Sequence, residues 1–121
     1  MIHRIFIPNW RPVLDNVLTR GNRFGVNKLK QADRKMIAAY AAADGTPKAT
    51  GKRLVTLEIT LTGRQQEADP MAYCKSLLDG LVKCGLLIDD TAEFCEWEPP
   101  TYQRAERGEE ASTTIVLTPI A

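Results

Sequence analysis

The segment from residue 67 to residue 90 constrains the fold most, because it combines an amphipathic helix pattern with carboxylates at both ends. Asp69 is predicted to cap this helix, with Pro70 at its first position and Gly85 ending it in the left-handed conformation. A short apolar run then leads to Asp89 and Asp90. If the chain doubles back through that run, Asp69 and Asp90 would meet at one edge of the fold, near Lys75. The side chains at helical spacing are Tyr73, Cys74, Leu77, Leu78, Leu81, Val82 and Cys84.

The remaining pattern alternates strands with helices and predicts an α+β (mixed α/β) fold: one mixed sheet of about four strands covered by two helices. The clearest strand is 54–62, where apolar and polar side chains alternate. The other predicted strands are 2–7, 94–98 and 113–118, and 103–111 is predicted to be a loop. A second helix is predicted over 28–43, with Asn27 as its cap. Its core side is predicted to carry Leu29, Met36, Ala39, Tyr40 and Ala43.

A length of 121 residues indicates one domain, 1–121, with a single core that needs no disulfides. No apolar run approaches the roughly 20 residues that span a bilayer, and Arg4 and Pro8 interrupt the pattern of a signal peptide. The three cysteines lack the spacing of a zinc or disulfide framework, which favours free thiols in a reducing compartment. A cytoplasmic protein that does not contact membranes is therefore expected.

Charge is divided unevenly along the chain. Residues 1–53 hold 11 lysines and arginines against 3 aspartates, a net +8, whereas residues 54–121 hold 5 basic against 12 acidic side chains, a net −7. A basic half beside an acidic half suits a protein that grips a polyanion with one part and binds metal with the other. The alternative is two solvated surfaces without a function.

Basic residues of the first half are the candidates for contact with a phosphate backbone. Residues 20–27 contain two glycines and two arginines and are predicted to be a flexible loop that becomes ordered on nucleic acid. Spacing alone leaves open whether the basic face of the following helix meets DNA or only water. The candidate DNA-binding residues are Arg11, Asn16, Arg20, Arg23, Lys28, Lys30 and Arg34.

Spacing in the central segment resembles that of the RusA family of Holliday-junction resolvases. Asp69 is followed six residues later by Lys75, and a Lys-x-Gly motif with three apolar residues leads to Asp89 and Asp90. An apolar strand, a proline-rich turn and Asn16 near the N-terminus are similar to the family as well. The resemblance implies an α+β homodimer that cuts four-way DNA junctions with Mg²⁺ or Mn²⁺ in recombination and repair. It makes Asp69, Lys75 and Asp90 the catalytic residues.

One position departs from the family pattern. The second aspartate of the Asp-x-Asp-Asn signature falls on Met71 and its asparagine on Ala72, and a thioether is a poor ligand for a hard cation. Glu67, two residues before Asp69, is a candidate replacement, so the expected metal ligands are Asp69, Asp90 and Glu67. Two alternatives stay open: a protein of the same fold that binds branched DNA without cutting it, and a structural or regulatory dimer whose basic half is only solvated.

Overall fold

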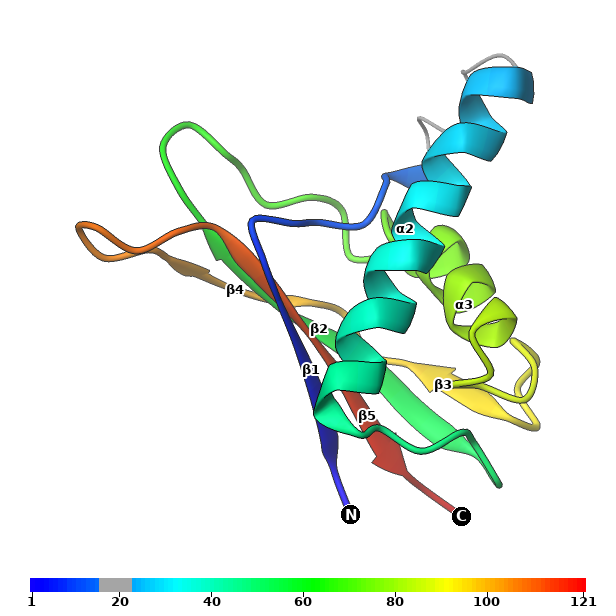
Figure 1. Ribbon diagram of the computed structural model, residues 1–121. Helices are drawn as coiled ribbons and strands as arrows, with labels where there is room; N and C mark the ends of the chain where they lie inside the picture. The colour runs from blue at the N-terminus through cyan, green and yellow to red at the C-terminus, as the bar shows by residue number, and fades with distance from the viewer. Residues whose placement is uncertain (16–22) are drawn as a thin grey trace.

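The computed structural model describes residues 1–15 and 23–121. In chain order the elements are β1 (His3–Pro8), α2 (Arg23–Asp44), β2 (Arg53–Leu61), α3 (Cys74–Lys83), β3 (Cys95–Trp97), β4 (Thr101–Arg104) and β5 (Ser112–Pro119) (Figure 1). The five strands form one sheet, and both helices lie on the same side of it. This arrangement confirms the predicted α+β fold with a mixed sheet and two helices.

The C-terminal strand β5 lies inside the sheet, between β1 and β2, and is antiparallel to both. Strand β2 then pairs in parallel with β3 through its first residues and with β4 through its last. Pro99 and Pro100 separate β3 from β4, because proline cannot donate a ladder hydrogen bond. The prediction of a loop from residue 103 was wrong for Gln103 and Arg104, which belong to β4.

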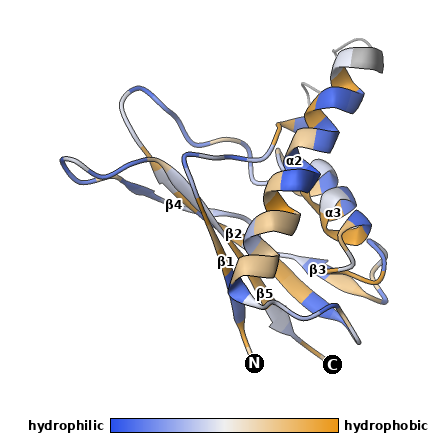
Figure 2. Cartoon of the chain, viewed as in Figure 1, coloured by the Kyte–Doolittle hydropathy of each residue, from blue (hydrophilic) through white to orange (hydrophobic). Residues whose placement is uncertain are grey.

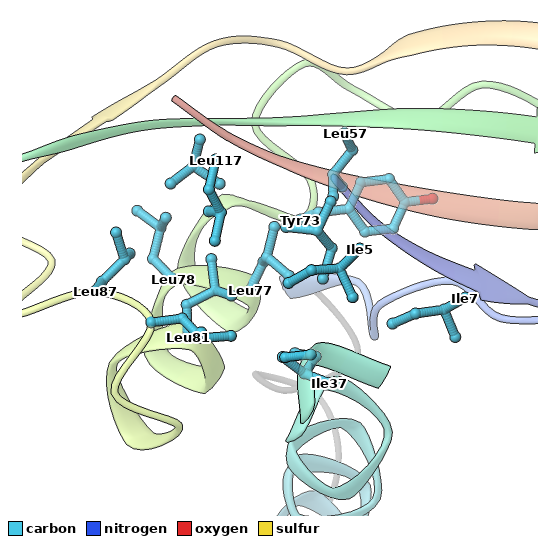
Figure 3. Close-up of a cluster of buried hydrophobic side chains, with 14 of the residues drawn as sticks. Ile5, Ile7, Ile37, Leu57, Tyr73, Leu77, Leu78, Leu81, Leu87 and Leu117 are labelled. Carbon is cyan, nitrogen blue, oxygen red and sulfur yellow. The ribbon is translucent and has the colours of Figure 1, made fainter. Parts of the chain in front are cut away.

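The core lies between the helices and the sheet (Figure 3). Val55, Leu57, Ile59 and Leu61 of β2 are all buried, as the alternation predicts. From α3 the buried side chains are Leu77, Leu78 and Leu81, and Tyr73 just before the helix is 0% exposed. The sequence pattern therefore identified the buried side of α3 and of the central strand.

Helix α2 differs from its prediction in length and in its core-facing side. It begins at Arg23 rather than Lys28, so the predicted loop is helical from residue 23 onward, and Asn27 lies inside the helix rather than at its cap. Ile37 and Ala41 are its buried residues, with Met36 and Tyr40 packed beside them. Leu29, Ala39 and Ala43 are exposed, contrary to the prediction. Charged residues are concentrated between residues 28 and 35 of this helix, and residues 38–43 are mostly alanine (Figure 2).

Helix α3 ends as predicted but begins later. Gly85 has φ 77°, its amide donates to Val82 O, and the Leu86 amide donates to Leu81 O, which together complete a Schellman C-cap. The helix starts at Cys74, four residues after Pro70, and Asp69 lies outside it in a turn. Asp69 is therefore not the helix cap.

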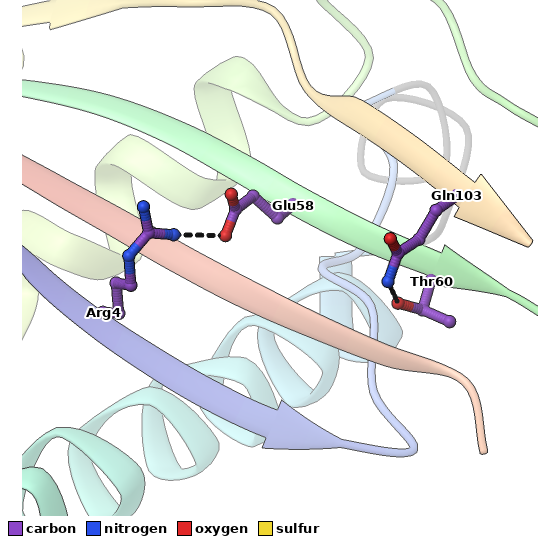
Figure 4. A network of polar contacts seen from close by, with 4 residues as sticks. All are labelled: Arg4, Glu58, Thr60 and Gln103. Carbon is purple, nitrogen blue, oxygen red and sulfur yellow. Dashed lines mark hydrogen bonds and ion pairs between the residues drawn. The ribbon is translucent and has the colours of Figure 1, made fainter. Parts of the chain in front are cut away.

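The sheet face opposite the helices is open (Figure 4). On it, Arg4 of β1 reaches across β5 to pair with Glu58 of β2, and Gln103 of β4 donates to the Thr60 hydroxyl at 3.0 Å. Neither helix of the described chain is both long and apolar enough to cross a membrane.

Candidate functional site

Asp15 caps helix α3 from a distant part of the chain. Its carboxylate oxygens accept the backbone amides of Lys75 at 3.1 Å and Ser76 at 2.8 Å, the second and third residues of the helix. Such first-turn amides have no partner within a helix, and a carboxylate there also compensates the helix dipole. The Asp15 amide donates to Ala72 O at 2.7 Å, so the backbone is fixed as well. Asp15 therefore caps the helix, which is the role that the sequence predicted for Asp69.

The segment 10–15, which carries Asp15, is fastened to both helices. Ser76 Oγ of α3 donates to Val13 O at 2.6 Å. On the other side, Asp33 of α2 accepts the Val13 amide at 2.9 Å and Trp10 Nε1 at 3.2 Å. Burial raises the pKa of Asp33 above its ordinary value, although these two hydrogen bonds lower it. These contacts hold Asp15 against α3, and they leave a second carboxylate, that of Asp33, partly buried.

Removing the Asp15 carboxylate is expected to weaken the fold. Asp15→Ala should lower the free energy of unfolding by about 1–2 kcal/mol, as for other lost N-caps, measured by urea denaturation. Asp15→Asn is the matched control, because asparagine also caps helices well and should retain most of the stability. An equal loss in both variants would contradict capping and point to the charge itself.

An open hollow of about 580 Å³ lies beside the start of α3. Asp15 and Asp69 both line it, so a carboxylate from the N-terminal segment and one from the predicted site belong to the same hollow. Met71 lines the same hollow and is 58% exposed. The remaining lining residues are Leu14, Ala68 and Ala72. We call this feature the α3 hollow.

The charge of Asp90 also reaches the start of α3. Burial raises the pKa of the Cys74 thiol, and the charges of Asp15 and Asp90 raise it further. Asp90 is exposed and its amide donates to Asp89 Oδ1 at 2.8 Å, in the bend that follows residues 86–88. Asp90 does not line the α3 hollow, so the structure does not place it with Asp69 there. Trp97 of β3 joins the two regions, since its Nε1 donates to Pro70 O at 3.1 Å.

The donor set of the α3 hollow suits a hard cation only in part. Within residues 1–15 and 23–121, no three or more His, Cys, Asp or Glu side chains gather into a group that could hold a metal ion. Asp15 and Asp69 supply oxygen donors, and Mg²⁺ is commonly bound through one or two carboxylates together with water and substrate phosphates. Glu67, the candidate replacement for the missing ligand, is exposed and does not line the hollow. The carboxylates of Asp15 and Asp69 are therefore compatible with a Mg²⁺ site whose remaining ligands are water and a substrate phosphate.

The basic residues predicted to meet DNA lie in several environments. Lys28 is exposed on α2, whereas Lys30 and Arg34 are half-buried and line a crevice shared with Asp33 and Asp79. Arg11 is half-buried, and its Nη1 donates to Gln66 O at 3.3 Å. The predictions for Asn16 and Arg20 fall outside the described residues. Arg23 begins α2, and nothing is described of its side chain.

Several other basic residues of the first half have structural contacts. Arg53 is 5% exposed and donates to Leu86 O at 2.8 Å and Pro47 O at 3.1 Å. Lys48 donates to Cys84 O at 2.6 Å, and Lys52 pairs with Glu96 at 3.0 Å. Together with the Arg4–Glu58 pair, these contacts account for part of the net +8 of residues 1–53. The charge division along the sequence therefore overstates the basic surface available to a polyanion.

The three cysteines are free thiols, as the sequence indicates. Burial raises the pKa of each thiol, which favours the protonated form and opposes metal ligation by thiolate. Comparison with known proteins found no matching family model and no matching curated protein.

Proposed function

We propose that this chain is a Holliday-junction resolvase-like endodeoxyribonuclease, which hydrolyses phosphodiester bonds at four-way DNA junctions with Mg²⁺ or Mn²⁺. The proposal rests on one observation above all: Asp69 lines the same hollow as a second carboxylate, Asp15, and the charge of Asp90 acts on Cys74 at the start of α3. The spacing of Asp69, Lys75 and Asp90, similar to the RusA family, supports the same conclusion. The proposed setting is DNA recombination and repair in the cytoplasm.

The proposal gives each residue of the site a role. Asp69 would hold the metal ion from within the α3 hollow, and Asp90, which does not line the hollow, would hold it from the neighbouring bend. The metal would supply an activated water and neutralise charge at the phosphorus. Lys75 is exposed in the first turn of α3, where its ammonium would contact the scissile phosphate or the charge that develops on it. Asp15 holds the backbone amide of Lys75 and so orients that turn.

Two carboxylates in one hollow attract a cation, and a bound cation attracts a phosphate. A metal ion in the α3 hollow would therefore interact with Asp15, Asp69 and a DNA phosphate together. We therefore expect metal and DNA to bind this site cooperatively.

Met71 supports a second candidate function. It is exposed in the α3 hollow at the position where the family signature has an aspartate, and a thioether cannot serve that carboxylate's role. A protein of this fold that binds branched DNA without cutting it would tolerate methionine there. Cleavage and binding must therefore be measured separately.

Salt-titrated binding tests the DNA-binding part shared by both candidates. We expect the chain to bind a synthetic four-way junction more tightly than linear duplex of equal length, with affinity falling steeply as salt rises. Lys28→Ala should reduce the salt dependence by about one unit of slope, whereas Lys83→Ala, a similarly exposed lysine at the end of α3, should not. Equal, salt-insensitive binding to both DNAs would favour a structural or regulatory protein instead.

A further inference from the structure

A second hollow, of about 470 Å³, lies on the face of the sheet that the helices leave open (Figure 4). Two rows of side chains line it, and each row crosses β1, β5, β2 and β4 through directly paired residues. The first row is Phe6, Thr114, Glu58 and Thr101. The second row, two residues along each strand, is Pro8, Ser112, Thr60 and Gln103. We call this feature the sheet-face hollow.

Differences in side-chain size make this part of the face concave. The middle of the second row consists of the small residues Ser112 and Thr60, which are 8% and 6% exposed. Phe6 on β1 is 54% exposed and lines one side. Gln103 on β4 lies on the other side, where its amide donates to the Thr60 hydroxyl at 3.0 Å (Figure 4). Small hydroxyl side chains therefore lie at the bottom of the hollow, with an aromatic ring beside them.

The hydroxyl of Ser112 points to a missing partner. Ile115 and Leu117 of the same strand lie in the core, and side chains alternate along a strand, so Ser112 faces the hollow. Its side chain is more than nine-tenths buried, yet its hydroxyl makes no hydrogen bond within residues 1–15 and 23–121. Buried hydroxyls are normally paired, because removing one from water without a partner costs free energy. A ligand in the hollow would supply that partner.

Three carboxylates give the sheet-face hollow its charge. Glu58, Glu109 and Glu110 line it, and none of the described residues that line it is a lysine or an arginine. Oε1 of Glu58 is paired with Arg4 from outside the hollow, and Oε1 of Glu109 accepts the Glu106 amide at 3.2 Å. Three carboxylates against the one guanidinium of Arg4 leave a net charge of −2. Such a hollow attracts cations and repels phosphates.

We propose that the sheet-face hollow binds the guanidinium group of an arginine side chain presented by a peptide segment of a partner protein. The guanidinium would stack on Phe6, pair with the exposed carboxylate of Glu110 and donate a hydrogen bond to the Ser112 hydroxyl. The chain itself shows that such a group fits over this face, because the Arg4 guanidinium already crosses β5 to reach Glu58 (Figure 4).

The acceptors of the hollow favour a guanidinium over an ammonium. A guanidinium is planar and weakly hydrated, so it stacks on an aromatic ring while its N–H groups donate in several directions. An ammonium is a compact, strongly hydrated charge that uses an aromatic ring less well. Carboxylates, hydroxyls and Phe6 together offer the contacts that a guanidinium uses. The hollow lies on the opposite face of the sheet from α3, so the inference is independent of whether the chain cleaves DNA (Figure 4).

Titration of the full chain with Nα-acetyl-arginine amide at low salt, followed by NMR, tests the site. The backbone amide signals of Ser112 and Thr114 should shift, with a dissociation constant on the order of 1 mM for a ligand this small. Nα-acetyl-citrulline amide, which has a similar shape but no charge, should not shift them, and Nα-acetyl-lysine amide should bind more weakly. Absence of a shift with the arginine ligand, or equal binding of the citrulline or the lysine ligand, would overturn the proposal.

Variants of the hollow should change the affinity in opposite directions. Glu110→Gln should weaken arginine binding about threefold. Ser112→Ala should weaken it by a similar factor without lowering the melting temperature, because its hydroxyl has no partner in the described chain to lose. Arg4→Met should strengthen binding, since it removes the guanidinium that competes for Glu58.

Glu93→Gln is the matched control, because Glu93 is an exposed carboxylate that does not line the hollow, and it should leave the affinity unchanged. Unchanged affinity in both Glu110→Gln and Ser112→Ala would overturn the proposal. Shifts of the Ser112 and Thr114 signals with protein concentration alone would assign the open face to a second copy of the chain and would overturn it as well.

Discussion

Replacing Arg53 by methionine is expected to lower the free energy of unfolding by about 2–4 kcal/mol. Arg53 is 5% exposed and lies in phase with the buried residues of β2. Its guanidinium donates to Leu86 O, after α3, and to Pro47 O, after α2. Leaving a buried acceptor without its donor costs about 1–3 kcal/mol, and methionine restores volume but not hydrogen bonds. Urea denaturation monitored by tryptophan fluorescence would measure the loss.

Lys52→Met is the matched control for Arg53. It removes the same charge one residue earlier, from a partly exposed pair with Glu96, and such pairs contribute about 0–1 kcal/mol. Burial lowers the pKa of Arg53, but a guanidinium stays protonated in proteins. The loss is therefore expected to be similar from pH 6 to pH 9. Equal losses in both variants would show that the buried contacts of Arg53 contribute little.

The second large effect concerns catalysis. Asp69→Asn and Asp90→Asn are each expected to reduce junction cleavage by about 100-fold or more, the usual cost of removing a group that stabilises charge in a transition state. Both carboxylates are exposed, so the variants should melt at the wild-type temperature. Rates would be measured under single-turnover conditions, which separate the chemical step from product release.

Two further variants sharpen the interpretation. Asp44→Asn, an exposed carboxylate at the end of α2, should leave cleavage unchanged. Glu67→Ala tests whether Glu67 replaces the missing ligand: if it does, the metal concentration needed for half-maximal rate should rise as much as in Asp69→Asn. Wild-type metal dependence in Glu67→Ala would instead agree with its position outside the α3 hollow.

Much of the fold could be predicted because the local pattern and the final environment agree. Val55, Leu57, Ile59 and Leu61 alternate in sequence and are all buried, and Gly85 adopts the positive φ that its position predicts. The start of α2 was missed because two glycines and two arginines favour a loop locally. In the structure, packing of Ile37 and Ala41 against the sheet stabilises α2, which begins at Arg23 within the predicted loop.

The candidate site was harder to predict because it depends on contacts between distant residues. Asp69 is a good cap by local rules, but Asp15, 60 residues before Lys75, supplies the acceptors. The role of Asp33 as a hydrogen-bond acceptor for segment 10–15 could not be predicted either, since its partners Trp10 and Val13 lie about 20 residues away. The burial of Arg53 could be predicted from the sequence, because position 53 continues the alternation of buried positions in β2 by one more step.

Cleavage of a synthetic four-way junction by the wild-type chain, with Mg²⁺ or Mn²⁺ and beside Met71→Asp and Asp90→Asn, tests the central claim most directly. We predict symmetric cuts near the branch point by the wild type, lost in Asp90→Asn and faster in Met71→Asp, which restores the carboxylate of the family signature. Junction binding without cutting by the wild type, with activity only in Met71→Asp, would favour the non-cleaving candidate. Absence of both binding and cutting in wild type and Met71→Asp would contradict a role on branched DNA.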